Sequence, residues 1–211
     1  MTSPSFVVRP ATTADAEGIA NILAAGFAVD PPLVWIIPDS SDRARLSSAF
    51  FRPFVDLVLA GGRGYVNEAM TAATLWLDID VSENSEDGGD LREQLIDGVG
   101  SEYAKRFFVL DEMFSARHPT HESHAYLVFI GVVPELQGRG IGTHFLTEQL
   151  SGLDEAGRSA YLEASSERNT ALYARQGFAP FGEPVALPDG PSLQPMWRQP
   201  SHVSPGSGEF A

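Results

Sequence analysis

The stretch GVVPELQGRGIG, residues 131–142, ends an apolar run and brings three glycines into five positions. The run before it, SHAYLVFIGVV at residues 123–133, is nearly unbroken and predicts a strand that is covered on both faces of a sheet. Ile141, Phe145 and Leu146 then begin a helical repeat of apolar residues. Because glycine admits positive φ and a helix start presents unpaired N–H groups, this junction predicts a site for an anionic group.

Three kinds of phosphate-binding loop place glycines between a strand and a helix. The P-loop requires a Gly-Lys pair, which this chain lacks, and the dinucleotide fingerprint G-x-G-x-x-G does not fit the spacing of Gly138, Gly140 and Gly142. What remains is the pattern Gln/Arg-x-x-Gly-x-Gly/Ala, in residues 137–142. Its successive N–H groups suit a diphosphate, and the alternative is a tight strand-to-helix turn without a ligand.

Charge and composition exclude several classes of protein. Lys and Arg total 14 against 28 Asp and Glu, and the net charge of −14 disfavours binding to nucleic acids and anionic membranes. With no cysteine, the chain has neither disulfides nor a thiol nucleophile. No apolar stretch is long enough to span a membrane, and the start MTSPSFVVRP does not match a secretory signal. We therefore expect a cytoplasmic protein.

The pattern along the chain predicts one mixed α/β domain over residues 1–200. The prolines of DPPLVWIIPD, residues 30–39, predict a loop or short turn that carries Trp35. Residues 201–211 predict a disordered tail, whose GSGEF is of a kind that cloning leaves. Strands are expected at 6–11, 64–68, 71–79, 123–133, 159–164, 178–187 and 192–198, and helices at 12–28, 42–60, 90–117 (broken near Gly98 and Gly100), 141–153 and 167–176.

Residues 137–142 resemble the acetyl-CoA loop of the GCN5-related N-acetyltransferases (GNAT). Three segments look like the puromycin N-acetyltransferase branch of that superfamily: HAYLVFIGVVPELQGRGIG (124–142), AYLEASSERNTALYARQGF (160–178) and AGFAVDPP (25–32). The resemblance covers about residues 6–198 and is strongest over 124–178. It implies the GNAT fold, a mostly antiparallel sheet of six to seven strands flanked by helices. In that fold strands four and five, here 123–133 and 159–164, splay apart to admit the pantetheine arm.

The same resemblance implies which residues bind acetyl-CoA. Main-chain amides of the glycine loop would hold its diphosphate, and the edge at Val132 and Val133 would pair with the pantetheine amides and supply an N–H for the oxyanion. Asn169 and Tyr173 lie four apart on one helical face and would line the slot. No metal is expected. The loop residues are Gln137, Gly138, Arg139, Gly140, Ile141, Gly142 and Thr143.

Catalytic roles follow from the matching positions. Tyr173 would protonate the departing thiolate, with a core tyrosine as the alternative. Glu163, near the end of strand five, would be the general base or the amine anchor, unless it is a carboxylate held by structural hydrogen bonds. His124, at the start of strand four, competes as the base. Trp35 is expected in the wall of the acceptor site, because the first helices cover that site in the family; Phe50, Phe54, Met113 and Phe114 are read as core or as part of that cover.

Two other patterns have ordinary explanations. The spacing of His118, His121 and His124 suggests a metal site, but Pro119 breaks any continuous helical face, so we expect a solvated loop. The acidic stretch 78–93 is expected to be a solvated surface, with steering of cationic amines as the alternative.

The expected function is acetyl-CoA-dependent N-acetylation of a primary amine by direct attack in a ternary complex. The acceptor would be a small molecule, an aminated metabolite or an antibiotic such as an aminonucleoside, which would make the protein an antibiotic-resistance enzyme. The alternatives are a non-catalytic acyl-CoA sensor or regulatory module, and a protein or peptide N-acetyltransferase. A monomer and a homodimer are both compatible with the sequence.

Overall fold

A computed structural model describes residues 7–82 and 89–201. The start of the strand expected at 6–11, the middle of the acidic stretch 78–93 and the predicted tail therefore lie wholly or partly outside the described residues. Within these residues no helix is long and apolar enough to cross a bilayer.

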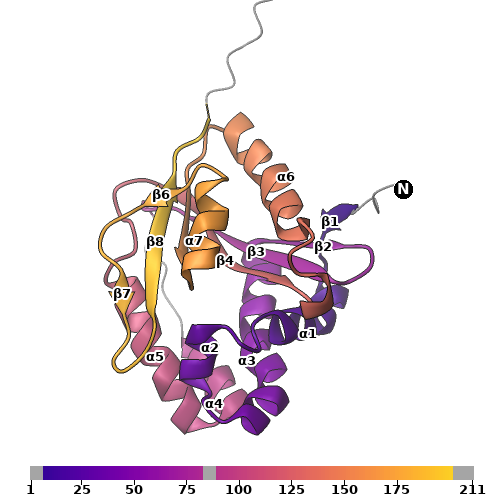
Figure 1. Cartoon of the computed structure of the whole chain (residues 1–211), viewed down its shortest axis with the longest axis vertical. Coiled ribbons are helices and arrows are strands. Elements are labelled where there is room, and N and C mark those ends of the chain that lie inside the picture. The colour runs from indigo at the N-terminus through magenta and orange to yellow at the C-terminus, as the bar shows by residue number, and fades with distance from the viewer. Residues whose placement is uncertain (1–6, 83–88, 202–211) are drawn as a thin grey trace, which may run out of the picture.

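The strands form one mixed sheet in the order β1-β2-β3-β4-β5-β8-β6, with β7 paired to β8 (Figure 1). Only β4 and β5 run parallel, which confirms the expected mixed, mostly antiparallel fold. The strand expected at 178–187 is two short strands, because Gly182 (φ +70°) and Pro184 turn the chain between them. The strands are β1 Val8–Pro10, β2 Arg63–Asn67, β3 Ala72–Ile79, β4 His124–Val132, β5 Ala160–Ala164, β6 Ala179–Pro180, β7 Val185–Ala186 and β8 Ser192–Arg198.

The helices begin and end at residues that the sequence makes recognisable. A short 3-10 turn (Thr13–Asp15) with a capping box at Thr12 starts α1. Asp39 caps α3 by accepting from the N–H groups of Ser41 and Asp42. Gly100, at φ +83°, separates α4 from α5 as predicted. The helices are α1 Ala16–Gly26, α2 Pro31–Ile36, α3 Ser40–Gly61, α4 Gly89–Val99, α5 Ser101–Ser115, α6 Ile141–Glu155 and α7 Glu167–Ala174.

The segment expected to be a loop at residues 30–39 contains the helix α2. Its prolines do not break the helix, because proline is tolerated in the first helical turn, and Asp30 before it is extended as an N-cap residue is. Trp35 therefore lies on a helix, which corrects the predicted loop position.

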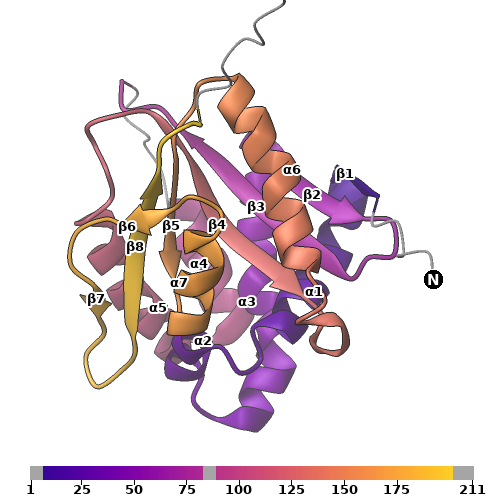
Figure 2. The same cartoon turned by 45° about the horizontal axis from the view of Figure 1, so that its top comes forward.

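The sheet separates two apolar layers. Helices α6 and α7 cover one face and pack on Trp76, Leu127 and Leu162, whereas α1 and α3 lie on the other face (Figure 2). The second layer is rich in phenylalanine and includes Phe50, Phe51 and side chains of α4 and α5. Most of the site residues predicted from the sequence line one cavity, which is bounded by side chains from both layers.

Candidate active site

The two central strands separate after a short pairing. In the described chain β4 and β5 pair only at Ala125–Ala160 and Tyr126–Tyr161. On the other side of β4, Val128 is a β-bulge, because Leu75 and Trp76 pair with Phe129 and Leu127 and leave it without a partner. A cavity of about 780 Å³ extends between the parting strands and the helices on both faces. The predicted splaying is therefore present in the structure.

The glycine loop forms one end of this cavity. Gly138 has φ +75° and Gly140, the N-cap of α6, has φ +82° and ψ 2°, conformations that favour glycine. A Cβ on either glycine would meet nothing within 4 Å, so the space beside the loop is open. No side chain caps α6, which leaves its first N–H groups facing that space. These features fit a bound diphosphate. The cavity is lined here by Gln137, Gly138, Gly140, Ile141, Gly142 and Thr143.

Two predicted cofactor contacts, Arg139 and Val133, require correction, and a third, Val132, is partly paired within the protein. Arg139 is exposed and is not part of the cavity lining. The N–H of Val133 donates to Thr71 O at 2.9 Å, so it is not available to a ligand. Val132 does line the cavity, but its carbonyl already accepts from Gln137 Nε2 at 3.0 Å. Some of the backbone hydrogen-bonding groups at the end of β4 are thus already paired within the protein.

Asn169 and Tyr173 lie together along the cavity, on α7. Asn169 Nδ2 donates to Ser165 Oγ at 3.0 Å, and Ser165 Oγ donates to Asp30 Oδ2 at 2.6 Å. Tyr173 is 7% exposed, and burial followed by the charge of Asp30 raises the pKa of its hydroxyl. Burial also raises the pKa of Asp30 to about 6 against the lowering effect of Ser165.

The predictions did not include Asp30 and Ser165. Asp30 precedes Pro31 and reads locally as an N-cap residue, whereas its partner Ser165 is 135 positions away in the chain. The only signal in the sequence was an acidic residue inside the AGFAVDPP segment.

Glu163 projects from β5 into the cavity lining. Its Oε2 accepts from the hydroxyl of Tyr126 at 2.9 Å, and its Oε1 is buried with no hydrogen-bond partner among the described residues. Burial raises the pKa of Glu163 to about 7, although hydrogen bonds from neighbouring tyrosines oppose the rise. The pKa of Glu163 thus lies near neutral pH, and its Oε1 has no hydrogen-bond partner among the described residues, although the buried hydroxyl of Tyr161 acts on the same carboxyl.

His124 lies outside the cavity. Its ring is fully buried at the start of β4, where Nδ1 lies 2.8 Å from Glu122 O and Nε2 lies 3.1 Å from His118 Nε2. Because a carbonyl only accepts, Nδ1 carries the proton and His118 donates to Nε2. Burial lowers the pKa of both rings, that of His118 to about 4. His124 is thus a packed structural residue, and the described chain has no group of three His, Asp or Glu that could hold a metal.

Trp35 also lies away from the cavity lining. Its Nε1 donates to Pro188 O at 3.0 Å, and the guanidinium of Arg106 lies 4.8 Å from its ring centroid. The hydrogen bond from Trp35 thus joins α2 to the loop before β8. Phe50, Phe54 and Phe114 do line the cavity, together with Phe27, Phe51, Phe107 and Phe129. The cavity is therefore walled by phenylalanine side chains and not by Trp35.

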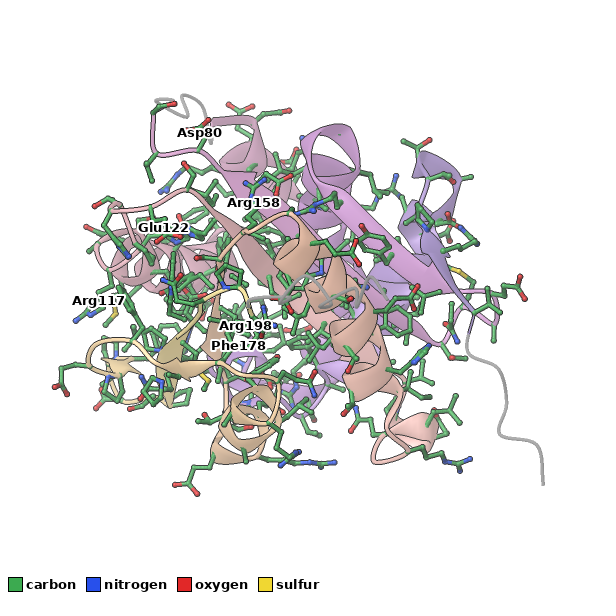
Figure 3. The ribbon with its side chains drawn as sticks, turned by 90° about the horizontal axis from the view of Figure 1, so that it is seen from above. Asp80, Arg117, Glu122, Arg158, Phe178 and Arg198 are labelled. Carbon is green, nitrogen blue, oxygen red and sulfur yellow. The ribbon has the colours of Figure 1, made fainter. Side chains whose placement is uncertain are left out.

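Polar groups fasten the end of the sheet where β4 and β5 begin. Arg158, just before β5, donates to His124 O at 3.3 Å. Arg198 forms two hydrogen bonds with Asp154, at 2.7 and 2.6 Å, and both side chains are nearly buried. Figure 3 looks onto this end and labels Arg158, Arg198 and Glu122. The strands are thus held together at their starts and open further along.

The cavity thus has a glycine loop with uncapped N–H groups at one end and a buried carboxylate beside the open strands, an arrangement that suits acyl transfer. Residues 103–178 match the model of the acetyltransferase (GNAT) family. The chain also resembles a solved histone acetyltransferase HPA2-related acetyltransferase from Corynebacterium glutamicum, with 25% identity, a TM-score of 0.66 and coverage of 94% of this chain and 98% of that one.

Two further solved structures share the fold. They are an agmatine N-acetyltransferase (18% identity, TM-score 0.59, 92% and 98% coverage) and the arylalkylamine N-acetyltransferase 2 of Aedes aegypti (11% identity, TM-score 0.60, 92% and 99% coverage). Residues 103–178 thus match the GNAT family and the solved structures share the fold along most of the chain, which supports an N-acetyltransferase enzyme. Members of this family use acetyl-CoA. The likeness to the puromycin branch stays a prediction.

Proposed function

We propose that the protein is an acetyl-CoA-dependent N-acetyltransferase that acts on the primary amine of a small molecule by direct attack in a ternary complex. The observation that carries the proposal is the continuity of one cavity from the glycine loop, past Tyr173, to the unpartnered oxygen of Glu163. Two substrates can meet in such a cavity without a covalent enzyme intermediate. Proteins named for acetylating agmatine and arylalkylamines share the fold and support a small amine as the acceptor.

The cofactor end is formed by main chain and α7. The N–H groups at Gly140 and in the first turn of α6 would hold the diphosphate, and Asn169 would lie along the pantetheine arm. Bound acetyl-CoA supplies the activated acetyl thioester. Val132 is the remaining strand-edge contact, and a ligand that pairs with its carbonyl must displace the Gln137 amide.

Glu163 is the proposed general base. An alkylammonium has a pKa of about 10.4, so proton transfer to a carboxylate of pKa about 7 is uphill by about 5 kcal/mol, against about 8 kcal/mol for an ordinary glutamate. The burial of Glu163 therefore removes about 3 kcal/mol from this step, while the carboxylate stays ionised in about half of the molecules at neutral pH. Its unpartnered Oε1 is the atom that accepts the proton.

Tyr173 is the proposed acid at the sulfur. The amine nitrogen forms its bond to the acetyl carbon as the carbon–sulfur bond breaks, and the sulfur receives a proton from the Tyr173 hydroxyl. Because burial and Asp30 raise the pKa of this hydroxyl, complete transfer to a thiolate of pKa about 8.5 costs more than about 2 kcal/mol. We therefore propose that the amine nitrogen transfers its second proton to the Tyr173 oxygen in the same step, which restores the hydroxyl.

The test is release of free thiol from acetyl-CoA with a panel of amines, with Tyr173→Phe as the catalytic control. The panel includes an aminonucleoside antibiotic, because the puromycin-like segments suggest one and would make the protein a cytoplasmic resistance enzyme. If acetyl-CoA raises the melting temperature but no amine releases thiol above hydrolysis, the protein is an acyl-CoA sensor. Mass shifts on intact proteins or peptides, without activity on small amines, would instead show a protein acetyltransferase.

A further inference from the structure

The acceptor end of the cavity is walled by phenyl rings. They come from the end of α1, from α3, α5 and β4, and their centroids lie 5.1 to 5.8 Å apart in mostly tilted or edge-to-face pairs. Such rings bind apolar or aromatic groups by burial and ring contact. The six residues are Phe27, Phe50, Phe51, Phe54, Phe107 and Phe129.

The rim of the cavity is apolar as well. Val29, before α2, is 85% exposed, and Leu57, on α3, is 46% exposed, and both contribute to the cavity lining. Apolar side chains that continue from a cavity to its rim mark the path of a ligand with an apolar body.

The carboxylates of the cavity are not equally free to bind a cation. Glu163 has an unpartnered oxygen, and Asp30 has only Ser165 as a side-chain partner. Asp111, on α5, also lines the cavity; partial burial raises the pKa of its carboxyl, and the positive charge of Arg92 opposes that rise. A second ammonium near Asp111 would therefore also meet the charge of Arg92, whereas no cationic side chain among the described residues acts on Glu163 or Asp30.

We propose that the acceptor is a monoamine with a bulky apolar body, aryl or alkyl, and that dications such as polyamines and agmatine are poor substrates. The ammonium lies at Glu163, and the body lies against the phenyl rings. A distal ammonium loses its water among these rings, and Asp111, the carboxylate on α5 in this lining, is already under the positive charge of Arg92, so the second charge weakens binding. This inference rests on the proposed function and assigns the acceptor class for the same site.

The test compares amines with and without a distal charge, and hexylamine and 1,6-diaminohexane form the matched pair. Thiol release is measured at pH 8 with hexylamine, 1,6-diaminohexane, 2-phenylethylamine and agmatine. The two monoamines are expected to exceed the dications in kcat/KM by about tenfold or more. Equal or higher kcat/KM for the dications overturns the inference while the proposed function stands. If none of the four releases thiol above hydrolysis, the proposed function fails, and the inference fails with it.

A negative charge introduced into the cavity lining provides a second test, because it should favour the dications. Phe114→Glu puts a carboxylate on α5 in the cavity lining, and it is expected to lower the hexylamine to 1,6-diaminohexane ratio by about tenfold. Val109→Glu is the matched control, because Val109 lies on the same helix, is 40% exposed and is outside the lining. A ratio that stays unchanged in Phe114→Glu, or that falls equally in both variants, contradicts the inference. Melting curves check that both variants fold, and the comparison of amines with the unaltered protein remains decisive if one does not.

Discussion

Replacing Glu163 by glutamine is expected to change the pH dependence of both activity and stability. The side chains have similar shape, so the substitution removes the ionisable group and keeps the volume. With Glu163 present, kcat/KM should rise with pH up to about 7, where the carboxylate is ionised, and then level off until the acceptor amine deprotonates. In Glu163→Gln only the neutral amine can react. Its kcat/KM should therefore be lower by about 10²-fold at pH 7 and rise steadily toward the pKa of the amine.

The effect on stability follows from the same pKa. The carboxyl of Glu163 has a pKa near 4.5 in the unfolded chain and about 7 in the folded protein. Below about pH 4.5 both states are protonated and there is no penalty, and as the pH rises toward 7 the unfolded state alone releases its proton. At about 1.4 kcal/mol per pKa unit, the folded protein loses about 3 kcal/mol over this range. Between pH 5.5 and pH 8 the loss is about 2 kcal/mol.

Urea unfolding at pH 5.5 and pH 8 measures this difference. Glu163→Gln should stabilise the protein by about 2 kcal/mol more at pH 8 than at pH 5.5, or by about 4 to 8 °C in the melting temperature. Glu112→Gln, at an exposed position on α5, is the control and should show no such change with pH. If Glu163→Gln keeps the inflection of activity near pH 7, the base is another group. If its gain in stability is the same at both pH values, Glu163 is not buried as the structure has it.

Three further predictions test other parts of the site and the fold. Tyr173→Phe should lower kcat by about 10²-fold with little change in the Kd of acetyl-CoA, and an unchanged kcat would remove Tyr173 as the acid. Gly140→Val should weaken CoA binding by about tenfold or more in calorimetry. Gly157→Val should not, because Gly157 has a similar positive φ and open surroundings but lies at the far end of α6. Equal losses of affinity in the two variants would mean that backbone strain, and not a ligand contact, causes the effect. Arg198→Met should cost about 3 kcal/mol in urea unfolding because it removes the cationic partner of Asp154 and leaves, among the described residues, only the N–H of Ser201 as a donor to it. The loss should shrink as the pH falls through the lowered pKa of Asp154, and a loss below about 1 kcal/mol would contradict the buried pair.

Features set by local backbone chemistry could be predicted from the sequence. Gly138 and Gly140 have the positive φ that their spacing suggested, and Gly100 divides α4 from α5 where the break was expected. The apolar run that ends at Val132 is a central strand. In each case the deciding interaction lies within a few residues of the chain.

Features set by tertiary contacts could not be predicted in this way. Glu122 O and the ring of His118 hold His124 inside the aromatic layer, whereas its position at the start of a strand suggested access to the slot. Pro188 comes from the opposite end of the chain to fix Trp35. The contact between Asp30 and Ser165 joins the segment before α2 to the end of β5, and no local pattern marks it.

The geometry of the sheet explains how the protein can keep a costly carboxylate at its centre. Where β4 and β5 begin, ladder pairs at Ala125 and Tyr126 and the bonds from Arg158 join the strands. Beyond Tyr126 the strands part, and the outer oxygen of Glu163 has no hydrogen-bond partner among the described residues. The same opening that raises the pKa of Glu163 also admits the substrates. The loss of about 3 kcal/mol of folding stability therefore arises at a carboxylate that an incoming ammonium can pair with. An amine that binds there should stabilise the protein more at pH 8 than at pH 5.5.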